Sequence, residues 1–325
     1  MESAQTPYDN LSPDVILDAM ESVGFQPTGG LLALNSYENR VYQAEMEDGS
    51  FAVAKFYRPN RWTLEAIEEE HAFTYELLEE EISVVPPLRQ DATSVFEHAG
   101  FQFALFARQG GHPPNLEVED DLEVLARTIA RLHAVGSRQR FVHRPMITST
   151  RFGDESRDYL LTHDFVPLEL ADAYASISEH LLERITPVMA DVPGIRIHGD
   201  CHMGNVLWRD DTAHFVDFDD CMTGPPIQDL WMLLSGERPE RTYQLSVILD
   251  AYNEFHDFDP ATLSLIEPLR TLRIMHHAAW IARRWDDPAF PIAFPGFDSV
   301  KYWSEHVLEL REQQAALDEP PLTYM

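Results

Sequence analysis

The stretch that decides both fold and chemistry is the polar loop HGDCHMGN at residues 198–205, followed by Asp217 at the end of the short run HFVD. Asp200 and Asp217 supply carboxylates, and Asn205 supplies an amide oxygen between them. Oxygen ligands of this kind suit Mg²⁺, a hard cation. Phosphoryl transfer needs an Asp that accepts the proton of the incoming hydroxyl, together with metal ligands drawn from Asn and Asp. The loop therefore predicts Mg²⁺-dependent phosphoryl transfer at Asp200, Asn205 and Asp217.

The same loop admits two other interpretations. Asp200 could cap a turn and Asn205 could take a left-handed turn position, as both residue types commonly do. His198 and His202 could instead be the metal ligands of a hydrolase. Neither an HExxH pattern nor paired CxxC accompanies them, and Gly199 directly follows His198. We therefore expect both histidines to brace the loop or to pack in the core.

Upstream of the loop, the sequence predicts a small antiparallel sheet with two helices. Alternating residues, a central Asp48-Gly49 turn and a run rich in Phe, Val and Tyr are typical of a β-hairpin. Ser12-Pro13 and Thr63 are suitable starts for helices. The elements expected are a helix from Pro13, hairpin strands over 40–46 and 51–57, a helix from Thr63, and strands over 82–88 and 101–106.

The sequence changes character at the GGHPP segment of residues 110–114, which interrupts regular structure. We place the boundary there, between a β-rich lobe of residues 1–109 and a helical lobe of residues 110–325. Apolar residues at helical spacing predict the helices, and brief apolar runs separated by Gly, Asp and Asn predict small strands. The helices are expected near 122–136, 168–185, 227–234, 243–255 and 263–285, and the strands near 195–198, 206–208 and 214–217.

Composition excludes several classes of function. The chain has 325 residues, enough for about two domains at ~150 residues each. Lys and Arg number 24 against 55 Asp and Glu, a formal net charge of −31 that repels nucleic acid and anionic membranes. Residues 1–7 carry no secretion signal, and two cysteines fit a reducing compartment. We expect a cytoplasmic protein with no nucleic-acid or membrane partner.

Together, the HGDxxxGN loop and the VDFDD run at residues 216–220 resemble the catalytic loop and metal-binding Asp of the aminoglycoside phosphotransferase group of kinases. Further blocks resemble one branch of that group, the cytoplasmic Ser/Thr protein kinases of the bacterial stress response. These blocks cover residues 34–42, 55–59, 228–234 and 283–291, and so span nearly the whole chain. The resemblance implies an α+β, two-lobed protein-kinase-like fold, with a small antiparallel sheet in one lobe and mainly helix in the other.

Carried over residue by residue, the resemblance implies a role for each matching position. Asp200 becomes the proton acceptor, Asn205 and Asp217 become the Mg²⁺ ligands, and Asp217 is a second essential acid. Ser36 lies in the loop that covers ATP. Asp229 matches a position that braces the catalytic loop, so we expect it to be structural.

Lys55 matches the strand lysine that contacts nucleotide phosphates, and its local sequence supports this role. It is the only charged residue in the apolar run of residues 51–57, and a lysine there requires a partner. Glu70 is the expected partner, because it shares a helix face with Ile67 and Phe73. The alternative is an edge lysine that discourages strand pairing.

The chain also departs from the protein-kinase pattern. No glycine-rich segment surrounds Ser36, the loop has Gly199 where protein kinases have Arg, and Asp219 follows Phe218 where they have Gly. Only about a dozen residues separate Asp217 from Asp229, which leaves little room for an activation segment. We expect a monomeric, ATP- and Mg²⁺-dependent Ser/Thr protein kinase of the stress response. A kinase of small-molecule alcohols and a nucleotide-binding pseudokinase are the alternatives.

Two further features are open to a functional interpretation. Cys201 and Cys221 flank the site residues, so their oxidation could silence the site, although we expect both to be small buried hydrophobes. Four arginines form the strongest basic cluster and could receive an acidic substrate, but we expect them to pair with carboxylates in so acidic a chain. They are Arg270, Arg273, Arg283 and Arg284.

Overall fold

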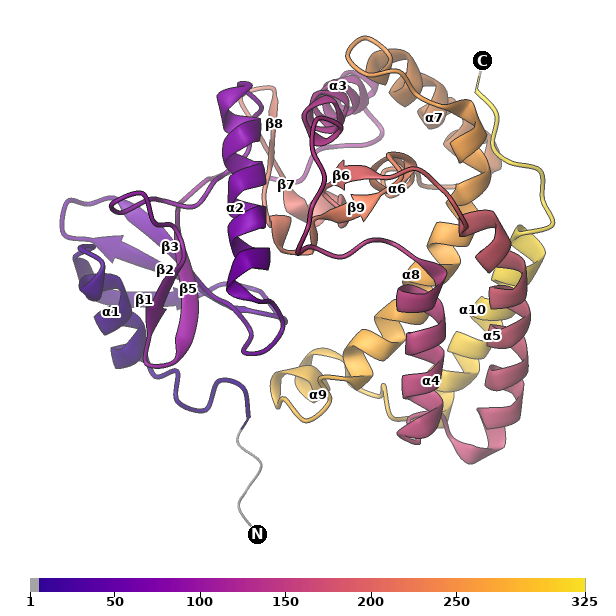
Figure 1. Cartoon of the computed structure of the whole chain (residues 1–325), viewed down its shortest axis with the longest axis horizontal. Coiled ribbons are helices and arrows are strands. Elements are labelled where there is room, and N and C mark those ends of the chain that lie inside the picture. The colour runs from indigo at the N-terminus through magenta and orange to yellow at the C-terminus, as the bar shows by residue number, and fades with distance from the viewer. Residues whose placement is uncertain (1–5, 325) are drawn as a thin grey trace.

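The computed structural model describes residues 6–324 and has two lobes, a sheet-based lobe and a larger helical one (Figure 1). The sheet is antiparallel, with strand order β1-β2-β3-β5-β4. The predicted hairpin is confirmed, with Tyr42 opposite Ala54 and the turn at Gly49. The strands are β1 (Pro27–Ala33), β2 (Arg40–Met46), β3 (Phe51–Phe56), β4 (Phe96–His98) and β5 (Phe101–Ala107).

Two capped helices accompany this sheet. Helix α1 (Pro13–Ser22) begins where the hydroxyl of Ser12 accepts a hydrogen bond from the amide of Val15. Helix α2 (Leu64–Glu79) begins in the same way at Thr63. Figure 1 shows α2 between the sheet and the helical lobe. Residues on α2 can therefore contact both lobes.

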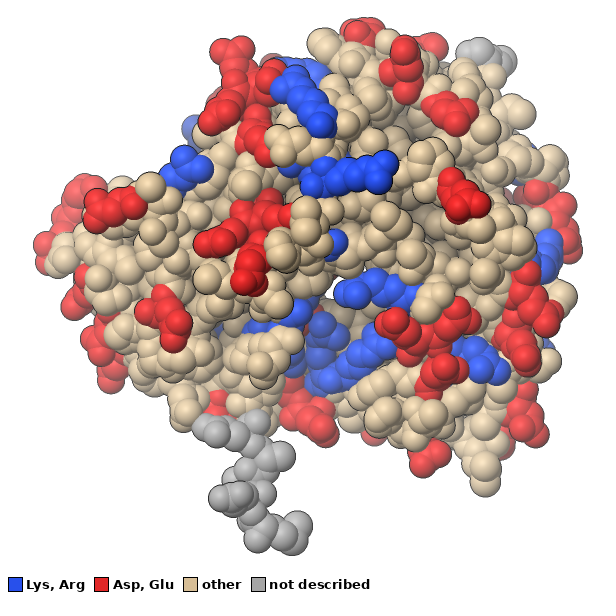
Figure 2. Space-filling view, viewed as in Figure 1, with Lys and Arg blue, Asp and Glu red and all other residues tan. Residues whose placement is uncertain are grey.

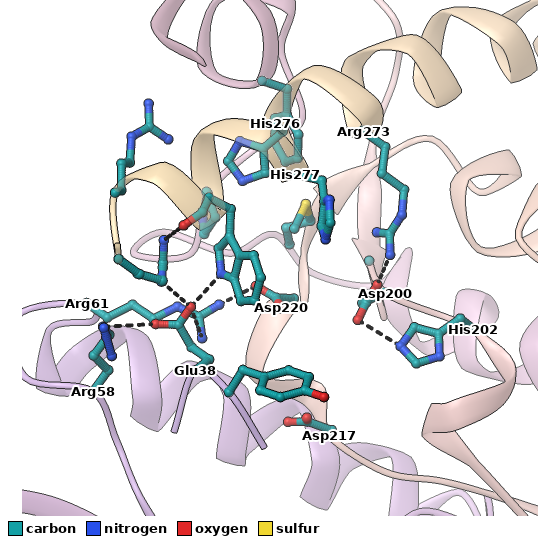
Figure 3. A pocket seen from close by; sticks show the side chains of 18 of the residues that line it. Glu38, Arg58, Arg61, Asp200, His202, Asp217, Asp220, Arg273, His276 and His277 are labelled. Atoms are coloured by element: carbon teal, nitrogen blue, oxygen red, sulfur yellow. Dashed lines mark hydrogen bonds and ion pairs between the residues drawn. The ribbon is translucent and has the colours of Figure 1, made fainter. Parts of the chain in front are cut away.

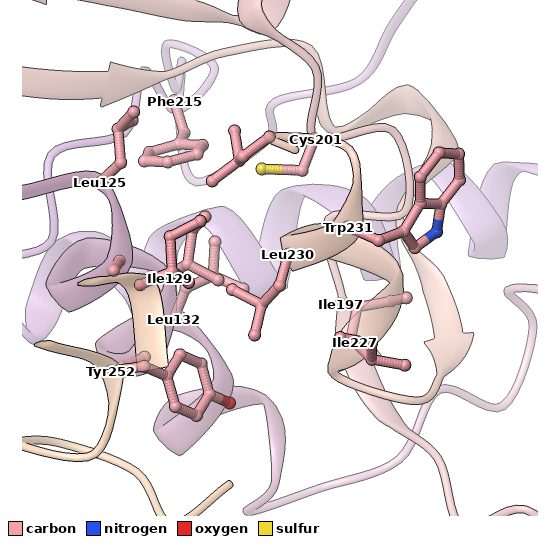
Figure 4. Packing of buried hydrophobic residues seen from close by; sticks show 14 of the residues in the cluster. Leu125, Ile129, Leu132, Ile197, Cys201, Phe215, Ile227, Leu230, Trp231 and Tyr252 are labelled. Atoms are coloured by element: carbon pink, nitrogen blue, oxygen red, sulfur yellow. The ribbon is translucent and has the colours of Figure 1, made fainter. Parts of the chain in front are cut away.

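The helical lobe holds two buried clusters and two small strand pairs. In Figure 4, Leu125, Ile129 and Leu132 pack toward Leu230 and Tyr252. Strand β6 (Ile195–Ile197) pairs with β9 (Met222–Gly224), and β7 (Val206–Arg209) pairs with β8 (Thr212–Phe215). The helices are α3 (Glu119–Gly136), α4 (Glu155–Thr162), α5 (Leu168–Met189), α6 (Ile227–Trp231), α7 (Arg238–Tyr252), α8 (Ile266–Ala282), α9 (Ala289–Ala293) and α10 (Val300–Ala316).

Some predicted elements are wrong or missing. Residues 82–88 form no strand and make only isolated bridges, from Val84 to Phe215 and from Pro87 to Phe106. Pro86 and Pro87 lack the amide hydrogens that a strand ladder needs. The prediction also omitted β1, β4, β9, α4, α9 and α10.

Within residues 6–324, no helix combines the length and the hydropathy needed to cross a bilayer. The N-terminal signal prediction concerns in part residues 1–5, which lie outside the described residues.

Candidate active site

The loop of residues 198–205 is held from behind by a buried carboxylate. Asp229, on α6, accepts hydrogen bonds from the backbone amides of His198 and Gly199, both at 2.8 Å. Its Oδ2 also lies 3.1 Å from Nε2 of His133 on α3. Gly199 has φ +84°, and a Cβ there would lie 2.4 Å from the carbonyl oxygen of Asp220. The loop conformation is therefore set by Asp229 and by the absence of a side chain at residue 199.

Asp200 lies at the open side of this loop, among three polar neighbours. Asn205 donates from Nδ2 to the backbone oxygen of Asp200 at 3.0 Å and to its Oδ2 at 3.3 Å. Arg273 on α8 contacts Oδ1 at 2.7 Å, and His202 Nε2 lies 3.4 Å from Oδ2, as Figure 3 shows. Burial alone would raise the pKa of Asp200, but His202 and Arg273 outweigh it and hold the pKa below its usual value. The carboxylate is therefore ionised and ready to accept a hydrogen bond.

Lys55 lies on the central strand β3, so the edge-strand alternative is wrong. Its Nζ contacts Asp217 Oδ1 at 3.0 Å, Asp219 Oδ1 at 3.3 Å and Glu70 Oε1 at 3.5 Å. Burial would lower the pKa of Lys55, but these three carboxylates outweigh it and hold the pKa well above its usual value. The expected ion pair with Glu70 is present, and the ammonium is fixed between the two lobes.

Asp217 occupies a left-handed conformation, with φ 57° and ψ 65°, just after β8. Its side chain is about half exposed, at 51%, whereas that of Lys55 is 7% exposed. Its carboxylate therefore combines a buried cationic partner with access to solvent.

Several charged residues of the site were missed by the sequence prediction. Asp219 is buried and contacts Arg61, which also bonds Asp220 at 2.5 Å. Burial would raise the pKa of Asp219, but Arg61 and Lys55 outweigh it and lower the pKa. Burial raises the pKa of Asp220, and only Arg61 among its main neighbours opposes that shift. The Phe-Asp-Asp sequence directly after Asp217 could have indicated these two acids. Nothing in the local sequence indicates their partner Arg61, which is distant in the chain.

Two cavities meet at the predicted site residues. The smaller, about 280 Å³, has apolar walls that include Val41, Val53 and Phe106, and it contains Lys55 and Glu70. The larger, about 870 Å³, contains Asp200 but not Lys55. Both cavities are lined by a shared set of residues at their junction. These shared residues are Asn35, Ser36, Gly204, Asn205 and Asp217.

The donor set at the junction fits a magnesium ion. Mg²⁺ usually takes one or two protein oxygens and completes its shell with waters and substrate phosphates. Asp217 offers a half-exposed carboxylate, and the amide nitrogen of Asn205 is occupied by Asp200, which leaves its oxygen for a cation. A pair of oxygen ligands where two cavities meet is suited to an ion that binds together with phosphate.

The histidines and cysteines of the loop have structural partners. His198 is buried, and its Nε2 lies 2.9 Å from the carbonyl oxygen of Val216. His202 caps the short turn of residues 203–205, with Nδ1 accepting from the amide of Gly204 at 2.9 Å. Among the described residues, no three His, Cys, Asp or Glu side chains form a group that could hold a metal. Cys201 and Cys221 are buried free thiols, as expected.

The basic cluster is divided between paired and unpaired members. Arg273 contacts Asp200, Arg270 contacts Glu267 at 3.1 Å, and Arg284 contacts Glu38 at 2.6 Å. Arg283 differs, because its hydrogen bond at 3.0 Å goes to the backbone oxygen of Glu155. Pairing with carboxylates is therefore confirmed for three of the four arginines.

A small antiparallel sheet packed against a helical lobe, with a lysine–glutamate pair and an Asp-containing loop between them, defines a phosphotransferase with the two-lobed, protein-kinase-like fold. Residues 31–266 match the Phosphotransferase enzyme family, and the chain belongs to that family.

Curated relatives extend over almost the whole chain. Stress response kinase A of Escherichia coli (strain K12) is 42% identical over 99% of this chain and 98% of its own length. The Serine/threonine protein kinase RdoA of Salmonella typhimurium is 41% identical over 97% of this chain and 96% of its own length.

Solved structures at lower identity share the fold. An amicoumacin kinase, solved with AMP-PNP and Ca²⁺, has a TM-score of 0.72 at 17% identity and covers 93% of each chain. A microcompartment-associated aminopropanol kinase also has a TM-score of 0.72, at 18% identity, and covers 95% of this chain and 100% of its own.

Proposed function

We propose that this protein is a Ser/Thr protein kinase of the stress response, which transfers the γ-phosphoryl group of ATP to a protein hydroxyl with the help of Mg²⁺. It acts as a cytoplasmic monomer, with a nucleotide-binding lobe of residues 1–109 and a catalytic lobe of residues 110–325. The observation that carries the proposal is the meeting of an apolar, lysine-containing cavity with a larger cavity that contains Asp200. The names of the curated relatives support the protein substrate and the stress response.

Each site residue has a defined part in this chemistry. Lys55, oriented by Glu70, binds nucleotide phosphates, and the loop at Ser36 covers them. Mg²⁺ held by Asn205 and Asp217 would neutralise charge on the phosphates. Asp200 accepts the proton of the acceptor hydroxyl as the new oxygen–phosphorus bond forms and ADP leaves with the electrons of the broken one. Asp200 is suited to orienting the hydroxyl, because its low pKa keeps it ionised.

A small-molecule alcohol is the second candidate acceptor. The segment from Asp217 to Asp229 is short, and a cavity of about 870 Å³ lies within the size range of pockets for small ligands. The amicoumacin and aminopropanol kinases that share the fold are named for small molecules.

Radiolabelled ATP distinguishes these candidates. Full-length protein is incubated with labelled ATP and Mg²⁺, with a generic protein substrate in one reaction and a panel of small alcohols in another. Label on Ser or Thr of protein supports the proposal, and label on an alcohol supports the second candidate. Absence of transfer in every reaction indicates a pseudokinase. Asp200→Ala is the control that should abolish transfer while nucleotide still binds.

A further inference from the structure

The larger cavity is rich in arginine although the protein is strongly acidic. Six arginines line it, out of 24 Lys and Arg in the chain. Figure 2 shows basic side chains gathered at the hollow between the lobes, with acidic side chains beside them and over the rest of that face. The six are Arg58, Arg61, Arg151, Arg273, Arg283 and Arg284.

Apart from Arg273, which contacts Asp200, three of these arginines have carboxylate partners inside the protein. Arg58 contacts Asp287 at 2.8 Å, Arg61 bonds Asp220, and Arg284 contacts Glu38 at 2.6 Å. Their charges are largely neutralised, so they serve the structure more than a ligand.

Arg151 and Arg283 lack such partners. Both are exposed at the cavity, and no described Asp or Glu side chain lies within ion-pair distance of either. Arg283 instead donates to a backbone oxygen and places its guanidinium 5.0 Å from the ring of Tyr159. The carboxylate of Glu155 acts on Arg283 at longer range, but neither guanidinium group is neutralised by a direct ion pair with a described side chain.

The positive charge of these arginines also acts on His276 of α8. Its ring is tilted against that of Phe152, with 4.4 Å between centroids, and the residue lines the same cavity. Burial, followed by Arg283 and Arg151, lowers the pKa of His276 to about 3. Because His276 is neutral, it does not repel an anion bound to the neighbouring guanidinium groups. A carboxylate at its position would repel such an anion.

Arg273 links this basic region to the chemistry. Figure 3 shows it reaching from α8 to Asp200, and its side chain is 40% exposed. A guanidinium has five N–H donors, so it can hold Asp200 and a second anion at once.

We propose that the acceptor carries, besides its hydroxyl, a carboxylate or phosphate group that binds to Arg151 and Arg283 and contacts Arg273. Guanidinium groups bind both anions with paired, charge-assisted hydrogen bonds. Acceptors that carry a positive charge at this position are rejected, because like charges repel in a partly buried cavity. The inference rests on the proposed transfer to a hydroxyl and deepens it by naming the class of acceptor.

The test compares matched acceptors with wild type and three variants. One arm uses a fluorescent Ser peptide flanked by Asp and the same peptide flanked by Asn, and the other uses glycerol 3-phosphate and glycerol. Binding to the full-length protein with Mg²⁺ and AMP-PNP is measured by anisotropy or calorimetry, and ADP release is measured with ATP. The variants are Arg151→Gln, Arg283→Gln and the control Arg311→Gln, which removes an exposed arginine of α10.

We expect the anionic member of at least one pair to bind roughly tenfold more tightly than the neutral one, which corresponds to ~1.4 kcal/mol. Arg151→Gln and Arg283→Gln should each remove most of that preference and leave binding of the neutral member unchanged, while Arg311→Gln should change neither. The arm that responds identifies the source of the anion, a peptide or a small molecule.

Equal binding of the anionic and neutral members in both pairs would overturn the inference, as would an equal loss of both in the two cavity variants. These results are separate from a failure of the proposed function. Arginine-dependent binding without ADP release would leave the inference standing and contradict the kinase. ADP release with no preference for an anionic acceptor would support the kinase and contradict the inference.

Discussion

At the scale of single residues, Asp229 shows how the site depends on a group that never contacts substrate. It is fully buried, and its two oxygens accept from consecutive amides of the catalytic loop. An amide in its place offers one accepting oxygen, so one loop amide would lose its partner. A buried unsatisfied donor costs about 1–3 kcal/mol.

Asp229→Asn should therefore lower the free energy of unfolding by about 1–3 kcal/mol and reduce turnover strongly, since the loop that carries Asp200 loses its support. Urea unfolding and steady-state kinetics measure the two effects. Asp250→Asn, at an exposed position on α7, is the control. If both variants unfold and turn over alike, Asp229 does not brace the loop.

His71 on α2 makes stability depend on pH. It is buried between the Tyr57 hydroxyl and the Ser94 hydroxyl, each at 2.8 Å, and burial lowers its pKa to about 3. Since the unfolded chain binds this proton near pH 6.5 and the folded protein does not, the contribution of His71 to stability is present above pH 6.5 and is lost as the pH falls toward 3.

The difference in unfolding free energy between wild type and His71→Gln should therefore narrow below pH 6.5, by up to about 1.4 kcal/mol per pH unit. Denaturant titrations of both proteins from pH 7.5 to 5 measure this difference, and the other ionisable groups cancel in the comparison. A difference that is constant over this range would show that His71 titrates alike in the folded and unfolded states, so that its pKa is not lowered by folding.

At the scale of elements, helix α2 is tied to the helical lobe along its length. The carboxylate of Glu69 accepts from the backbone amides of Val142, His143 and Arg144 at 2.7–2.8 Å. About two turns further on, Glu76 pairs with Arg196 at 2.6 Å. These contacts hold the helix in the position that directs Glu70 toward Lys55.

Glu69→Ala should loosen this attachment and weaken nucleotide binding severalfold, because Lys55 loses a fixed partner. Glu68→Ala, on the exposed face of the same helix, should have little effect. Calorimetric titration with AMP-PNP and Mg²⁺ compares the two variants. Equal affinities would mean that α2 keeps its position without Glu69.

Elements with strong local signals were predictable, whereas very short strands and a strand that contains glycines were not. The Asp48-Gly49 turn and the caps Ser12 and Thr63 produced the expected hairpin and helices, because each acts within a few residues. Strands β4 and β9 have three residues each, too few for a periodic pattern. Strand β1 was missed because the Gly29-Gly30 pair interrupts its pattern of side chains.

At the scale of the whole molecule, a network of buried charges joins the two lobes. Asp287, after α8, contacts Arg40 at 3.0 Å and Arg58 at 2.8 Å, both from the sheet lobe. The carboxylate of Glu38, in the sheet lobe, accepts a hydrogen bond from the indole N–H of Trp280 at 2.6 Å and also contacts Arg284. These contacts hold the two lobes together beside the larger cavity.

Asp287→Asn should destabilise the protein by about 3–5 kcal/mol, because two guanidinium groups lose a buried partner. Asp286→Asn removes an adjacent, exposed carboxylate and should be nearly neutral. Thermal and urea unfolding of both variants measure this. Equal stability in the two would show that the network does not hold the lobes together.

The same network marks the limit of what the sequence could predict about the site. Asp200, Asn205 and Asp217 lie within twenty residues of one another, and the loop pattern identified them before their positions were known. The Arg273–Asp200 and Glu38–Arg284 contacts join residues far apart in the chain. No local pattern indicates such a pair, since only the packing of α8 against both lobes brings them together.

The most direct measurement of the central claim is nucleotide affinity as a function of Mg²⁺ concentration in wild type, Asp200→Ala and Asp217→Ala. We predict that Mg²⁺ tightens AMP-PNP binding in wild type and in Asp200→Ala but not in Asp217→Ala, and that neither variant transfers phosphate from ATP. Undiminished Mg²⁺ dependence in Asp217→Ala, or substantial transfer by Asp200→Ala, would contradict the roles assigned to these two carboxylates.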